Sequence, residues 1–195
     1  MLNYPLNLSF KIIAIAPQIK VTDSLGQTVL YVRQKALALR EDVRIYADEQ
    51  QQQQLYQLNA DRILDWSANY RVRTVDGLDL GNIRRRGMRS LWNATYEVTD
   101  PNGQPTAVIH EENVWVKVLD GLVGEIPIAG MILPIFINPA YLVDRDAQTV
   151  LRMQKEPAIL EGKFTIEKRG DFAEREESLL LASLLMMILL ERSRG

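Results

Sequence analysis

The chain has 195 residues, of which 47% are apolar and 25% are charged, a balance typical of a soluble globular protein of one domain. The formal net charge of −2 gives no overall basic field, so we expect no nucleic-acid partner. The absence of cysteine excludes disulfides, thiolate metal sites, cysteine nucleophiles and palmitoylation, and it suits a cytoplasmic protein.

Two apolar stretches resemble targeting or membrane segments, and both are interrupted. The first residues, MLNYPLNLSFKIIAIAPQ, have no basic segment, and Lys11 and Pro17 break their apolar run, so we expect no secretory signal. Residues 121–137 (GLVGEIPIAGMILPIFI) contain Glu125 and two prolines, which favours a buried or interfacial connection over a membrane span.

One short phrase occurs twice, at residues 21–27 (VTDSLGQ) and 98–104 (VTDPNGQ). Aspartate accepts hydrogen bonds from turn amides and glycine supplies a positive φ, so both copies predict tight turns between strands. Residues 75–79 (VDGLD) and 144–148 (DRDAQ) are looser relatives, and the glutamine run at 50–54 predicts a solvated hairpin tip. Such turn signals between short apolar runs indicate an all-β sheet of hairpins.

Apolar and polar residues alternate between these turns, which predicts strands with one buried and one wet face. The clearest cases are residues 43–48, 92–99 and 160–167; in the second of these, Tyr96 and Val98 point one way and Glu97 points the other. Further strands are predicted near residues 8–15, 18–23, 28–35, 55–60, 69–75, 79–86, 105–111 and 149–154.

Two segments have helical character. Apolar residues in the segment 112–123 follow i, i+3, i+4 spacing. The second helix is predicted from about residue 172 to 192, with acids before its apolar run and arginines after it, which suits the helix dipole.

The second helix has no wet face, because only Ser183 is polar between residues 179 and 190. Ser183 is expected to bond a helix carbonyl rather than to act as a nucleophile. The apolar run has twelve residues, too few for a membrane span of about 20. A helix that is apolar all round must be surrounded, so we expect the amphipathic strands to close into an antiparallel barrel around it.

Several phrases resemble the LURP-one-related (LOR) family, whose members have a tubby C-terminal-like barrel. Residues 80–92 (LGNIRRRGMRSLW) and 96–98 (YEV) resemble the middle of these proteins. Residues 138–143 (NPAYLV) and 190–195 (LERSRG) resemble the bacterial branch. The resemblance covers nearly the whole chain. It implies one domain over residues 1–195, a closed barrel of about twelve strands around a hydrophobic C-terminal helix.

The resemblance specifies a fold rather than an activity. The same superfamily includes phosphoinositide-binding tubby domains and phospholipid scramblases. No tubby phosphoinositide motif carries over, and the cysteine-rich region of scramblases is absent because the chain has no cysteine. The resemblance therefore implies a barrel protein that is distantly similar to phospholipid scramblases, and we expect no cofactor.

The best candidate for an anion-binding site is a dense basic cluster. If this segment is extended, Arg84 and Arg86 share one face, and Arg85 joins Ile83 on the other. Arginine can fork onto phosphate oxygens, and a glycine at position 87 lets the backbone approach a ligand. The alternative is a solvated strand end whose arginines pair with nearby acids such as Asp76 and Asp79. The cluster consists of Arg84, Arg85, Arg86 and Arg89.

The single histidine, His110, precedes Glu111 and Glu112, which could suggest a metal site or a general base. With no second histidine and no cysteine, an ordinary histidine at a strand end is the favoured interpretation. No phosphate loop, nucleophile elbow or zinc-protease motif occurs, so we expect no catalytic residue and no metal site.

These observations favour a non-enzymatic cytoplasmic barrel, peripheral to a membrane, that binds an anionic partner such as a phospholipid head group through its arginine cluster. The alternative is a structural or protein-interaction module that meets a protein partner through residues 121–137.

Overall fold

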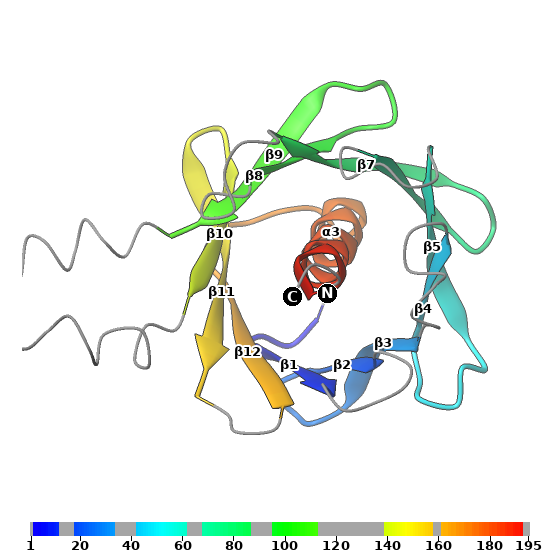
Figure 1. Cartoon of the computed structure of the whole chain (residues 1–195), viewed down its shortest axis with the longest axis vertical. Helices are drawn as coiled ribbons and strands as arrows, with labels where there is room; N and C mark the ends of the chain where they lie inside the picture. The colour runs from blue at the N-terminus through cyan, green and yellow to red at the C-terminus, as the bar shows by residue number, and fades with distance from the viewer. Residues whose placement is uncertain are drawn as a thin grey trace, which may run out of the picture.

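The computed structural model is a closed antiparallel barrel of strands with a helix, α3 (Glu174–Arg192), through its centre (Figure 1). The structure describes residues 2–11, 18–33, 42–61, 68–86, 95–112, 139–157 and 161–192. In this part of the chain the twelve strands are β1 (Leu6–Lys11), β2 (Gln18–Thr22), β3 (Thr28–Arg33), β4 (Asp42–Tyr46), β5 (Gln54–Ala60), β6 (Asn69–Thr74), β7 (Asp79–Arg86), β8 (Thr95–Thr99), β9 (Pro105–Glu111), β10 (Ala140–Arg145), β11 (Gln148–Glu156) and β12 (Glu161–Lys168).

Each strand pairs with the strands before and after it in sequence, and β1 pairs with β12 to close the ring. All pairings are antiparallel. The closing ladder runs from Leu6 opposite Ile166 to Lys11 opposite Glu161. Closure removes the free sheet edges that an open sheet of amphipathic strands would expose.

The up-and-down order gives the barrel two different rims. One rim, which we call the turn rim, carries the tight turns at residues 23–27, 47–53, 75–78, 100–104 and 146–147. The opposite rim, which we call the loop rim, carries the other strand ends, among them Lys11, Arg33, Arg86 and Glu111. The helix α3 follows β12 from the turn rim, so its first turn lies there and its last turn lies at the loop rim.

The two copies of the repeated phrase form the same turn. The Asp23 carboxylate accepts hydrogen bonds from the amides of Leu25 and Gln27 at 3.0 and 2.9 Å, and Gly26 has φ 79°. In the second copy, the Asp100 carboxylate accepts from the amides of residues 102 and 104 at 2.9 and 2.8 Å, and Gly103 has φ 82°. The predicted aspartate–glycine turns are therefore confirmed.

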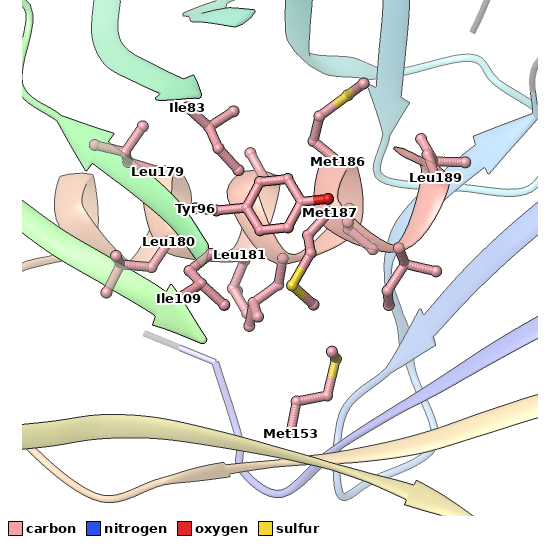
Figure 2. Close-up of a cluster of buried hydrophobic side chains, with 14 of the residues drawn as sticks. Ile83, Tyr96, Ile109, Met153, Leu179, Leu180, Leu181, Met186, Met187 and Leu189 are labelled. Atoms are coloured by element: carbon pink, nitrogen blue, oxygen red, sulfur yellow. The ribbon is translucent and has the colours of Figure 1, made fainter. Parts of the chain in front are cut away.

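The apolar residues of α3 are buried on every side of the helix, so α3 fills the barrel. Leu180 and Leu184 are 0% exposed, and Met186 and Met187 are 1% exposed. Inward side chains of the strands, among them Ile83, Tyr96 and Ile109, surround it (Figure 2). The apolar run at residues 179–190 thus forms the centre of the core, as the sequence predicts.

Helix α3 packs most closely on β7, where a glycine permits the approach. Gly81 has φ 143°, a region that other residues rarely adopt. A Cβ at this position would collide with the carbonyl oxygen of Thr99 and lie 2.9 Å from Cδ2 of Leu179. Both the backbone conformation and the close packing of α3 therefore require a glycine at position 81.

Most predicted elements are confirmed, with small changes at their ends. The strand β10 is missing from the prediction, because a bulge between Val143 and Asp144 disturbs the alternation that marks a strand. Ser183 is buried, and its hydroxyl makes no hydrogen bond to the described residues, so the expected bond to a helix carbonyl is wrong. The predicted helix at 112–123, apart from Glu112, and the connection at 121–137 lie outside the described residues.

Candidate anion-binding site

Strand β7 divides the predicted arginine cluster between its two faces. Arg84 and Arg86 are exposed on the outer face, whereas Arg85 is 7% exposed and points inward with Ile83. This is the alternation that the sequence predicts for an extended strand. Arg85 therefore cannot join Arg84 and Arg86 in one site on the outer surface. Arg89 lies outside the described residues.

The two outer arginines share one carboxylate, that of Glu97 on the neighbouring strand β8. Arg84 Nη2 lies 2.9 Å from Glu97 Oε2, and Arg86 Nη2 lies 3.1 Å from Glu97 Oε1. The strand register brings them together, because Arg84 stands directly opposite Glu97. The Glu97 carboxylate thus bridges two guanidinium groups that are two residues apart on the same strand.

The sequence suggested different partners for these arginines, and that expectation is wrong for the described residues. The Asp79 carboxylate lies 3.6 Å from Nε of Arg71 on β6. Asp76 lies in the turn between β6 and β7, where a hydrogen bond from the Thr74 hydroxyl lowers the pKa of its carboxyl group. Both acids belong to the turn rim, whereas Arg84 and Arg86 lie toward the loop rim.

Glu97 holds the arginines without burying them. The Glu97 side chain is 7% exposed, whereas those of Arg84 and Arg86 are 52% and 61% exposed. Each guanidinium group carries five N–H donors, and the Glu97 carboxylate accepts hydrogen bonds from only some of them. The pair therefore presents fixed donors to solvent, with a charge of +1 after Glu97 is counted.

Strand β6 adds a further arginine to the same outer face. Arg71 stands opposite Asn82 of β7, and Arg84 follows Asn82 two residues later on the same face. Such diagonal neighbours on a sheet are close enough for long side chains to interact. The Arg71 side chain is 51% exposed and has Asp79 as its acidic neighbour. The outer face of β6 and β7 therefore carries a local excess of arginine in a protein of negative net charge.

The inner arginine, Arg85, contacts the end of α3 at the loop rim. Arg85 Nε lies 3.7 Å from Glu191 Oε1, in the last turn of α3. The hydroxyl group of buried Tyr96, the strand partner of Arg85, donates a 2.5 Å hydrogen bond to the same Glu191 oxygen. Burial raises the pKa of the nearby Glu111 carboxyl group, and the negative charge of Glu191 raises it further. Arg85 and Tyr96 thus fasten the end of the helix to the barrel wall.

His110 lies on the outer face of β9, where both of its ring nitrogens meet acceptors. Nε2 lies 2.8 Å from Asp144 Oδ2, and Nδ1 lies 3.1 Å from the backbone carbonyl oxygen of Glu111. Burial lowers the pKa of His110, but the bonds to Asp144 and to the Glu111 carbonyl outweigh this effect, and the pKa is raised overall. Two acceptors favour the imidazolium, which has no lone pair for a metal ion or a proton.

The described part of the chain offers little else for chemistry. No group of three or more histidine, aspartate or glutamate side chains among these residues is arranged to hold a metal ion. None of its helices is long and apolar enough to cross a membrane. The outer arginines are therefore the feature that most clearly suggests a ligand.

Sequence reasoning found the arginines but missed Glu97, Tyr96 and Glu191 as their partners. The alternation in residues 92–99 does predict that Glu97 points away from Tyr96. Which strand lies next to it, and in what register, depends on the ladder between β7 and β8. That register requires the connection between the strands to be known, and no short motif specifies it.

Comparisons with known proteins agree with this fold. A sequence model of the LURP-one-related family matches residues 28–126, which cover half of the chain. An X-ray structure of a protein from Arabidopsis thaliana is similar over 96% of this chain and 91% of that one. Its TM-score is 0.50 and its sequence identity is 12%, so the likeness concerns the fold alone. A search of curated proteins gave no match.

Proposed function

This chain belongs to the LURP-one-related family, and we propose that it acts as a binding protein without catalytic activity. Its ligand is a phosphate-bearing anion, with a phospholipid head group as the leading case. The binding residues are Arg84 and Arg86. In this proposal the protein is cytoplasmic and peripheral to the membrane, and it needs no cofactor.

One observation carries the proposal: two half-exposed arginines are held side by side by a buried carboxylate. Long side chains usually lose conformational entropy when they bind, and this loss weakens surface ion pairs. Glu97 orders both guanidinium groups before a ligand arrives, so less entropy is lost on binding. Planar guanidinium groups also match the oxygen geometry of phosphate.

The remaining polar clusters support a binding role less well. The imidazole of His110 has both nitrogens engaged, and Arg85 is buried and paired with Glu191. We therefore remove Arg85 from the proposed binding set and keep Arg84 and Arg86, with Arg71 as a neighbouring charge. Arg89 stays in the set as a prediction from the sequence.

The test is co-sedimentation with vesicles of phosphatidylcholine alone or mixed with phosphatidylglycerol. We expect the wild type to bind the mixed vesicles and the variant Arg84→Ala/Arg86→Ala to bind about thirtyfold more weakly, since each basic residue near an anionic surface contributes about 1 kcal/mol. Equal binding by both proteins, or no binding by either, contradicts the proposal.

A matched control separates this site from general charge. Arg44 and Arg169 are 53% and 49% exposed, and each pairs with one carboxylate elsewhere on the surface. The variant Arg44→Ala/Arg169→Ala loses the same charge and should bind close to wild type. Soluble dimethyl phosphate, a singly charged phosphodiester, should compete when in excess if the phosphate group itself is recognised, whereas a requirement for the bilayer surface would leave binding unchanged.

A further inference from the structure

We infer that Glu97 determines the charge of the phosphate group that the Arg84–Arg86 pair accepts, so that the site takes a singly charged phosphodiester and gains little from a doubly charged phosphomonoester. This inference rests on the proposed function. It concerns a residue that does not meet the ligand, because Glu97 lies beneath the arginines and acts through them.

The position of Glu97 makes it a fixed part of any bound state. Its side chain is 7% exposed, and each of its carboxylate oxygens meets a different arginine. A ligand reaches the guanidinium groups from the solvent side, where they are half exposed. The ligand therefore adds to the existing carboxylate instead of replacing it.

The charges at the site then decide which anion is favoured. Two guanidinium groups and one carboxylate leave a charge of +1, which one singly charged phosphodiester neutralises. Once the first negative charge of the ligand has neutralised the site, a second negative charge gains little electrostatic attraction. The removal of water from that second charge still opposes binding. Without Glu97 the same arginines would present +2, and a doubly charged phosphomonoester would gain from both.

Most phospholipid head groups are joined through a phosphodiester. Soluble compounds with a terminal phosphate group are phosphomonoesters, and free phosphate is inorganic. The buried carboxylate thus points to a lipid surface as the source of the anion. It disfavours capture of soluble phosphate compounds, which carry about two charges at neutral pH.

The experiment compares the wild type with Glu97→Gln on two kinds of vesicle. One contains phosphatidylglycerol, a singly charged diester, and the other contains phosphatidic acid, a monoester, at the same molar fraction in phosphatidylcholine. We expect Glu97→Gln to bind phosphatidylglycerol about threefold more tightly and phosphatidic acid about tenfold more tightly, since removing the carboxylate favours a doubly charged ligand about twice as much in free energy as a singly charged one. The selectivity between the two lipids therefore shifts toward the monoester.

Two further variants distinguish an effect of the Glu97 charge from a general loss of structure. Glu97→Asp keeps the charge with a shorter side chain, so it should keep the wild-type selectivity even if both affinities fall. Arg44→Ala, on another part of the outer face, should leave the selectivity unchanged. A loss of folding alone would lower both affinities together and leave their ratio unaltered.

The outcomes separate the two proposals. If the wild type binds through Arg84 and Arg86 and Glu97→Gln shows the same ratio, this inference is wrong and the proposed function stands. If Arg84→Ala/Arg86→Ala binds as well as the wild type, the site itself is misassigned. Absence of binding by both the wild type and Glu97→Gln contradicts both.

Discussion

On the inner side of β7 and β8, Arg85 and Tyr96 meet Glu191 at the end of the helix, whereas on the outer side Arg84 and Arg86 meet Glu97. Both sides join arginine to a glutamate. The inner arginine is 5% exposed at its side chain, and the outer ones are more than half exposed. The same residue type therefore stabilises the fold on one side and stays available for a ligand on the other.

The comparison extends to the whole barrel wall. Inward residues define one hydrophobic core with the helix, as Figure 2 shows for Ile83, Tyr96 and Ile109. Outward residues such as Arg44 and Arg169 make exposed ion pairs that contribute little to stability because solvent screens them. Substitutions on the two sides should therefore differ in kind: inner ones change stability, and outer ones change binding.

The largest effect is expected in the helix. Leu184 is 0% exposed, and Leu184→Asp would bury a charge without a partner. We expect a loss of about 5–10 kcal/mol, comparable with the whole stability of an ordinary domain, because the unpaired charge adds to the apolar packing that is lost. Leu184→Met, which keeps the volume, should cost less than about 1.5 kcal/mol. Circular dichroism and chemical denaturation measure both, and a well-folded Leu184→Asp would show that the barrel does not depend on this helix.

The contact between the helix and β7 should be the next most sensitive point. Gly81→Ala adds a methyl group against Thr99 and Leu179 and places alanine at φ 143°. We expect it to destabilise the protein by about 2–4 kcal/mol. Gly103→Ala is the control, since its φ is also positive but its Cβ would meet nothing within 4 Å, so about 1–2 kcal/mol is expected. Equal losses would mean that helix packing is not the reason for Gly81.

A smaller difference separates the inner and outer arginines in stability. Arg85→Gln removes a buried guanidinium group and its ion pair with Glu191, so we expect a loss of about 1–2 kcal/mol. Arg84→Gln, at a half-exposed side chain, should cost no more than about 0.5 kcal/mol. Thermal unfolding of the two variants under the same conditions checks this. A more damaging Arg84→Gln would reverse the roles assigned to the two faces.

The smallest effect concerns His110 and depends on pH. Its folded pKa is raised above the ordinary histidine value of about 6.5, so its contribution to stability is fully present below about pH 6.5 and is lost as the pH rises through the folded pKa. The contribution should stay below about 1 kcal/mol, because the pair with Asp144 is one-third exposed. Unfolding of wild type and His110→Gln from about pH 5.5 to about pH 8.5 should show a gap that narrows with rising pH. A gap that widens would contradict the ion pair.

Much of this architecture was accessible from sequence, for reasons that particular residues make clear. The run of apolar residues around Leu184 has no wet face, which requires a surrounding wall and predicts the barrel. The alternation around Arg85 predicts which arginines point inward. The strand β10 escaped prediction because the bulge after Val143 breaks its period of two. Glu97 could not be predicted as the partner of Arg84 and Arg86, because the register between neighbouring strands is set by the closed sheet and not by a local sequence pattern.

The most direct test of the division between the two faces is binding of Arg84→Gln, Arg85→Gln and Arg86→Gln to vesicles containing phosphatidylglycerol, each measured on folded protein. The structure predicts weaker binding for Arg84→Gln and Arg86→Gln, by about fivefold each, and unchanged binding for Arg85→Gln. A folded Arg85→Gln that loses as much binding as the other two would contradict the assignment of Arg85 to the helix and of its neighbours to the ligand.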